Sequence, residues 1–93
     1  MLSPATYVLV QYDYVENMLE RRAPHREGHL ERARQAKARG ELLNAGALGE
    51  AEGALFVFAP GADRAAREFA EDDPYVLAGL VPRWAITTWN VVV

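Results

Sequence analysis

Residues 41–59, ELLNAGALGEAEGALFVFA, decide the fold because they contain two apolar stretches separated by a short polar loop. The apolar stretches are residues 41–48 and 54–59, and the loop between them is bounded by Gly49 and Gly53. Apolar runs of this length on either side of a glycine-containing loop are typical of a β-hairpin. The sequence therefore predicts two antiparallel strands in the middle of the chain.

The segment before this hairpin predicts one strand followed by helix. Residues 6–12 are β-branched and aromatic, which favours a strand. Residues 16–39 are rich in Glu, Arg, Ala and Leu and contain no β-branched residue, which favours a helix. Pro24 suits a first helical position, so we expect a turn or short helix near 15–22 and a main helix over about 24–39.

The segment after the hairpin predicts the same order of helix and strand. Apolar residues recur at helical spacing over 64–71, and residues 83–93 form a β-rich run with two tryptophans. The whole order is β-α-β-β-α-β, the split βαβ pattern of ferredoxin-like folds. We therefore expect an α+β fold in which a four-stranded antiparallel sheet carries both helices on one face.

The predicted strands are apolar on both faces. In the first strand Tyr7 and Leu9 alternate with Val8 and Val10, and the strands over 54–59 and 83–93 show the same pattern. Two helices cover one face, and an uncovered apolar face is larger than soluble monomers usually tolerate. We therefore predict a homodimer that packs through the open sheet face.

Composition narrows the function classes. The chain has 93 residues, of which 51% are hydrophobic and 25% charged, and we expect residues 1–93 to form one domain. A net charge of −3 offers no footprint for nucleic acid, and no stretch is apolar enough to cross a membrane. The absence of cysteine excludes disulfides and thiolate metal sites. We expect a cytoplasmic protein that binds neither nucleic acid nor membrane.

The two histidines, His25 and His29, are the first candidates for chemistry. Their i, i+4 spacing places them on a similar side of the main helix. The intervening glutamate is not where zincin motifs need it, and a third metal ligand would have to come from Asp13, Asp73 or elsewhere. We therefore expect no metal and no cofactor. His29, beside the core, is either a buried histidine with one structural hydrogen bond or a general acid/base, and a contribution from His25 stays open.

Charged residues near His29 suggest two partners. Arg22 and Arg26 precede it near the start of the helix and could hold an anionic group; alternatively they form a solvated face paired with Glu27 and Glu31. Asp73 precedes a proline and is a natural N-cap for residues 74–78, but a carboxylate could also orient the imidazole of His29. Two further expectations are close packing at Gly28 and a core or interface position for Tyr75 and Trp84.

These residues resemble the YCII-related (YciI-like) family. The resemblance covers nearly the whole chain, and the segments that carry it are Tyr7–Asp13, Arg26-Glu27-Gly28-His29-Leu30, Gly40-Glu41-Leu42, Ala45-Gly46, Asp72-Asp73-Pro74-Tyr75-Val76, Ala78-Gly79 and Trp89-Asn90-Val91. The resemblance implies a dimeric α+β barrel type of ferredoxin-like fold. It also implies a His-Asp active site at His29 and Asp73, with Arg26 lining the site.

The candidate residues and the family resemblance together suggest a small enzyme. His29 and Asp73 would form an acid/base dyad for cofactor-independent proton transfer, as in an isomerase or a dehydrochlorinase-like lyase, on a small anionic or aromatic substrate. Arg26 and Arg22 would bind that substrate. The alternative is a non-catalytic dimer that binds a small metabolite or acts as an accessory protein.

Overall fold

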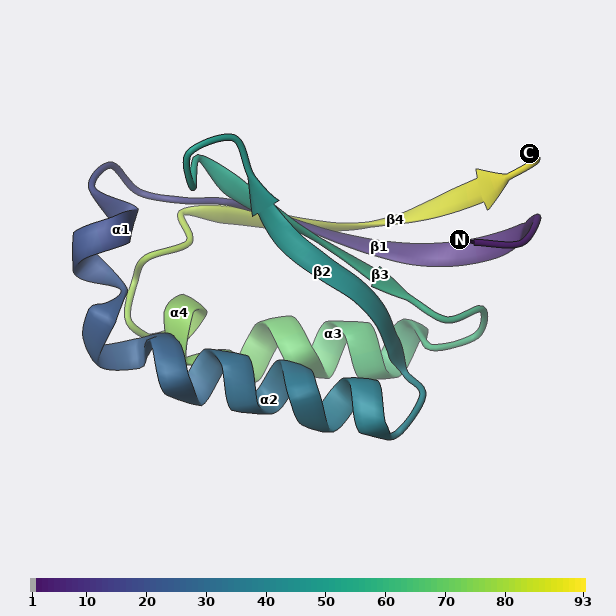
Figure 1. Cartoon of the computed structure of the whole chain (residues 1–93), viewed down its shortest axis with the longest axis horizontal. Coiled ribbons are helices and arrows are strands. Elements are labelled where there is room, and N and C mark those ends of the chain that lie inside the picture. The colour runs from purple at the N-terminus through teal and green to yellow at the C-terminus, as the bar shows by residue number, and fades with distance from the viewer. Residues whose placement is uncertain (1) are drawn as a thin grey trace.

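The computed structural model describes residues 2–93 and contains one four-stranded antiparallel sheet (Figure 1). The strands lie in the order β2-β3-β1-β4. Their bounds are β1 Ala5–Asp13, β2 Leu42–Leu48, β3 Gly53–Phe58 and β4 Arg83–Val91. The predicted hairpin is thus present as β2 and β3, and the chain's first strand lies between the hairpin and its last strand.

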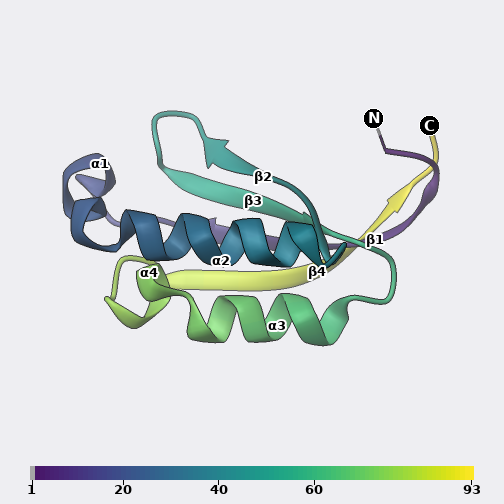
Figure 2. The same ribbon diagram turned by 60° about the horizontal axis from the view of Figure 1, so that its bottom comes forward.

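Two longer helices cover one face of this sheet (Figure 2). They are α2 Arg26–Ala38 and α3 Asp63–Asp72, while the shorter elements are α1 Met18–Arg21, the 3-10 turn η1 Ala23–His25 and α4 Pro74–Leu77. Pro24 lies in η1, so the main helix begins at Arg26, two residues later than expected. The predicted α+β ferredoxin-like fold, of the type found in dimeric α+β barrels, is confirmed.

The core lies between the sheet and the two long helices. The register pairs Val10 with Phe56 on one side and with Ile86 on the other, so these side chains share the face toward the helices. α2 buries only His29 and Ala36, because most of its surface is charged. The fully buried large side chains of the core are Val10, Tyr12, Phe56, Phe58 and Tyr75. His29 is therefore part of the core from the first turn of α2.

The opposite sheet face is apolar around Tyr7, Val57 and Trp89, as expected, but polar around Gln11, Asp13 and Arg83, and its apolar part is less exposed than the sequence pattern suggests. Trp89 is 39% exposed, whereas Tyr7 and Val57 on the same face are already buried within a single chain. The ring of Tyr7 packs against Trp89, with centroids 6.3 Å apart, and its hydroxyl donates to the carbonyl of Ser3 at 2.6 Å.

Within residues 2–93, no helix is long and apolar enough to span a membrane.

Candidate functional site

The fold brings together His29 and Asp73, which are 44 residues apart in the sequence. His29 is on the first turn of α2, and Asp73 is at the junction between α3 and α4. The imidazole Nδ1 lies 2.8 Å from Oδ2 and 3.0 Å from Oδ1 of the carboxylate. Asp73 is completely buried and His29 is 7% exposed, so little water competes for this hydrogen bond.

Asp73 accepts two further hydrogen bonds. The hydroxyl of Tyr12 on β1 donates to Oδ2 at 2.7 Å, and the backbone N–H of Tyr75 donates to Oδ1 at 3.0 Å. The second bond is the predicted N-cap of α4. Taking a carboxylate out of water costs several kcal/mol, and donors on both oxygens offset this cost by stabilising the negative charge. The surroundings of Asp73 therefore suit an ionised carboxylate.

The hydrogen bonds fix the tautomer of His29. An ionised carboxylate can only accept, so Nδ1 of a neutral imidazole must carry the proton that it donates to Asp73. Nε2 then has a free lone pair. Nε2 has no hydrogen-bond partner within residues 2–93. In that range the Tyr75 hydroxyl is the one buried side-chain polar atom without a partner, so Nε2, which also lacks a partner, is not buried. The imidazole thus presents a basic nitrogen that solvent reaches.

Aromatic contacts hold the imidazole ring in place. Tyr75 stacks on one face of it, with centroids 4.0 Å apart and planes inclined by 11°. Phe56 and Phe69 approach at 5.9 Å and 6.2 Å with their planes steeply inclined to it. Packing on this scale restricts ring rotation, so the orientation set by Asp73 is maintained.

A pocket of about 260 Å³ opens beside His29. Arg22 and Arg26 line it together with the histidine, and its lining includes no Asp or Glu. The other lining residues are apolar or aromatic: Tyr14, Leu30, Ala33, Ala45, Gly46, Ala47, Ala54, Phe56 and Tyr75. Two guanidinium groups without a carboxylate make this pocket suited to a small anion, although the chain as a whole carries a charge of −3.

The alternative prediction for the two arginines is wrong about their ion pairs, although Arg26 is exposed, as a solvated face requires. Glu27 and Glu31 form their ion pairs with Arg34, at 2.9 Å and 3.3 Å, rather than with Arg22 or Arg26. Arg34 lies one to two turns further along α2, on the solvent side. Both arginines near the start of the helix are therefore left to line the pocket.

The structure also places the remaining candidates for metal binding. His25 ends η1 and is not among the residues that line the pocket of His29. Asp13 is at the end of β1, paired with Arg83 at 3.0 Å. Within residues 2–93, no group of three or more His, Asp and Glu side chains could hold a metal ion.

Gly28 packs closely, as the sequence indicates. A Cβ at this position would lie 3.4 Å from Cγ of Pro74, the first residue of α4. α2 and α4 thus lie in close contact at this point, next to the contact of His29 with Asp73.

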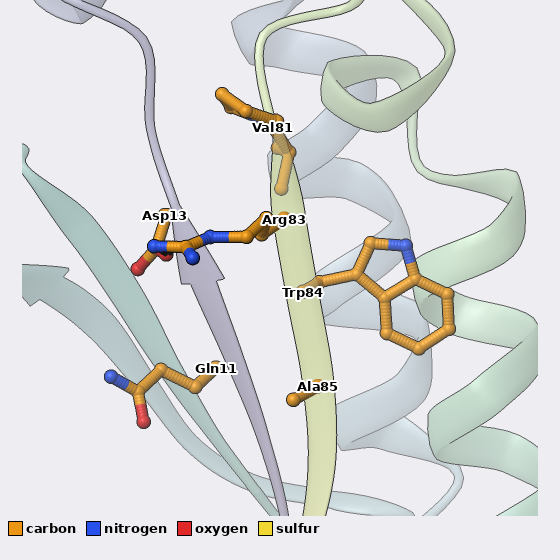
Figure 3. Close-up of a pocket in the computed structure, with 7 residues that line it drawn as sticks. Gln11, Asp13, Val81, Arg83, Trp84 and Ala85 are labelled. Carbon is orange, nitrogen blue, oxygen red and sulfur yellow. Dashed lines mark hydrogen bonds and ion pairs between the residues drawn. The ribbon is translucent and has the colours of Figure 1, made fainter.

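A larger cavity, of about 610 Å³, lies away from the dyad (Figure 3). Gln11, Asp13, Arg83 and Ala85 line it on the open sheet face, where Arg83 reaches across to Asp13, while Trp84 points to the other side of β4. The charge of Asp13 is balanced by Arg83, and no histidine lines this cavity. Its residues offer no partner for proton transfer comparable to the dyad.

Sequence reasoning missed the site roles of three tyrosines. Tyr12 bonds to Asp73, Tyr14 lines the pocket, and Tyr75 is buried in the core as expected but also lines the pocket. For Tyr12 a signal was available, because strand alternation places it on the same face as Val8 and Val10. Burial raises the pKa of Tyr12 and of Tyr14, and the charge of Asp73 raises both further.

Comparison with protein families gives one match. The model of the YCII-related domain matches residues 5–90, nearly the whole chain. The comparison with curated proteins found no match.

Solved structures with the same fold have low sequence identity to this chain. The 5-chloro-2-hydroxyhydroquinone dehydrochlorinase TftG from Burkholderia phenoliruptrix, in complex with 2,5-dihydroxybenzoquinone, is 18% identical with a TM-score of 0.73, over 89% of this chain and 92% of that one. Protein Atu4242 from Agrobacterium tumefaciens is 12% identical with a TM-score of 0.60, over 95% and 94%. A NIPSNAP domain protein from Burkholderia xenovorans is 12% identical with a TM-score of 0.58, over 95% and 95%. At these identities, the similarity shows a shared fold.

Proposed function

We propose that this chain, which belongs to the YCII-related family, is a small-molecule enzyme. In this proposal His29 and Asp73 form a dyad that transfers protons without a cofactor. The observation that carries this proposal is the 2.8 Å contact between Nδ1 of His29 and Asp73 beside a pocket that His29 lines. Buried, oriented histidines next to a pocket are typical of acid/base sites.

In this mechanism Nε2 of His29 removes a proton from a carbon or hydroxyl of the substrate. The electron pair of the broken bond forms an enolate, or it expels a leaving group as an anion in an elimination. Asp73 stabilises the imidazolium through Nδ1, and the imidazolium then returns the proton, to another substrate atom in an isomerisation or to solvent in an elimination. Arg26 and Arg22 hold the substrate anion or the developing oxyanion.

The substrate that we propose to test first comes from the structural neighbour. TftG is named for the dehydrochlorination of 5-chloro-2-hydroxyhydroquinone, a small hydroxylated aromatic compound whose ionised form is an anion. A compound of this class fits the charge and the aromatic walls of the pocket. We also propose that the protein works as a homodimer through its open sheet face.

The test measures chloride release and ultraviolet absorbance with 5-chloro-2-hydroxyhydroquinone and related chlorinated or enolic anions. Loss of the base in His29→Gln should lower the rate by about 10²- to 10⁴-fold, and Asp73→Asn, which disturbs the tautomer, should also lower it strongly. His25→Gln is the matched control, because it makes the same substitution one turn away, outside the pocket, and should keep the parent's rate.

Two outcomes would count against the enzymatic proposal. Equal rates in the parent and in folded His29→Gln would exclude His29 as the base. Binding of 2,5-dihydroxybenzoquinone without turnover of any compound in the panel would favour the alternative, a dimer that binds a small metabolite.

A further inference from the structure

The hydroxyl of Tyr75 is the one buried side-chain polar atom within residues 2–93 that has no hydrogen-bond partner. Tyr75 itself is 2% exposed, and its ring is fixed by the stack on His29 and by an edge contact from Tyr14 at 5.9 Å. A buried hydroxyl without a partner destabilises a folded protein, and a phenylalanine would fill nearly the same space without this penalty. The hydroxyl therefore requires an explanation other than packing.

The surroundings of this hydroxyl indicate what its partner must be. Tyr75 lines the pocket with Arg22 and Arg26, whose positive charges act against the rise in its pKa that burial causes. Arginine can only donate hydrogen bonds, so neither side chain can accept the hydroxyl proton of Tyr75. The pocket lining contains no carboxylate that could accept it. No described residue accepts this proton in the structure, so an acceptor from outside the chain would complete the hydrogen bonding of the hydroxyl.

We propose that Tyr75 is a ligand-binding residue that donates a hydrogen bond from its hydroxyl to an anionic oxygen of the ligand in the His29 pocket. This inference rests on the proposed function, because it assigns a ligand contact in the same site. Arg26 is exposed and lines the same pocket, so its guanidinium can reorient toward the same oxygen. The ligand class is then a small planar anion whose charged oxygen contacts Tyr75 and an arginine while its flat part lies near the imidazole.

The experiment compares Tyr75→Phe with the parent in two measurements, stability of the free protein and affinity for benzoate. Benzoate is the probe because it is a small planar anion, and benzamide is its neutral counterpart of nearly the same shape. In Tyr75→Phe we expect a higher urea midpoint, since an unpartnered buried hydroxyl is removed, and about tenfold weaker benzoate binding by calorimetry or NMR titration. Benzamide should bind the parent more weakly than benzoate.

Tyr12→Phe is the matched control, because it removes a buried hydroxyl that does have a partner. Its hydrogen bond to Asp73 is lost, so its urea midpoint should fall where that of Tyr75→Phe rises. Opposite stability changes in these two variants would not arise if both hydroxyls served packing alone.

Three results would overturn the inference: benzoate that does not bind the parent, a Tyr75→Phe variant that binds benzoate as tightly as the parent, or a fall in its urea midpoint. None of these measurements involves proton transfer. A failure here is therefore distinct from a failure of the dyad, which the rate of His29→Gln measures.

Discussion

Asp73 accepts hydrogen bonds from three elements, β1, α2 and α4. Each donor replaces a hydrogen bond to water that the carboxylate loses on burial, and each of the three bonds affects a different part of the structure. The bond from Tyr75 starts α4, the bond from His29 selects its tautomer, and the bond from Tyr12 ties the site to the sheet. A single side chain thus connects local helix capping to the orientation of the candidate base.

Tyr12 should make the protein sensitive to alkaline pH. Burial and the charge of Asp73 raise its pKa above the ordinary value of 10.0, so the folded chain keeps the phenol proton where the unfolded chain releases it. The folded state then binds more protons, and the free energy of unfolding should fall as pH rises past about 10, by about 1.4 kcal/mol per pH unit for this proton.

Urea unfolding of the parent and of Tyr12→Phe at pH 7 to 11 measures this effect. The variant should be less stable at neutral pH, because it lacks the hydrogen bond, but should lose less stability above pH 10 than the parent does. Parallel pH profiles for the two proteins would contradict the assignment.

At the scale of elements, the pairing of β1 with β3 sets the position of Tyr12. The register places Tyr12 opposite Ala54 and Asp13 opposite Gly53 at the start of β3. A Cβ at Gly53 would collide with the backbone carbonyl oxygen of Tyr12. Glycine at this position therefore allows the two strands to pair where the dyad needs the Tyr12 hydroxyl.

Gly53→Ala should accordingly destabilise the protein, because backbone atoms must move to relieve the collision. We expect a loss of about 1 to 3 kcal/mol in the free energy of unfolding, measured by urea denaturation. Gly46→Ala on β2 is the matched control, since a Cβ there meets nothing within 4 Å and should change stability little. Equal stability changes at the two glycines would refute this role for Gly53.

The elements themselves were largely predictable, and their contacts were not. Apolar periodicity and the Gly49–Gly53 loop indicated the hairpin, and proline placement divided the helical segment, although Pro24 entered the 3-10 turn rather than α2. Strand alternation could have placed Tyr12 on the same face as Val8 and Val10, but no spacing rule brings position 12 to position 73. Contacts between distant segments depend on tertiary packing, so the pairing of His29 with Asp73 rested on the family resemblance until the structure placed them together.

For the whole molecule, the open sheet face predicts self-association. Trp89 is 39% exposed on this face, and Leu9 and Leu55 on the same face are half-buried. Contact with a second copy would remove this apolar surface from water, at about 25 cal/mol per Å². The burial of Tyr7 and Val57 within one chain reduces the area available, so we expect a dimer that dissociates more readily on dilution than the sequence pattern alone suggests.

Sedimentation velocity at micromolar concentration tests this prediction. The parent should sediment as a dimer, and Trp89→Glu should shift it toward monomer while leaving the far-ultraviolet circular dichroism unchanged. Leu77→Glu is the control, because Leu77 is 72% exposed on α4, outside the sheet. A monomeric parent, or equal dissociation by both variants, would exclude the open face as the interface.

The double use of Asp73 has a consequence for interpreting related chains. Replacing an N-cap typically costs about 1 kcal/mol, so an aspartate at this position is worth keeping even in a protein that performs no chemistry. An aspartate at this position in a homologue therefore does not indicate activity. His29 does not cap α4, so in a homologue that has lost the activity we expect the histidine to be replaced before the aspartate.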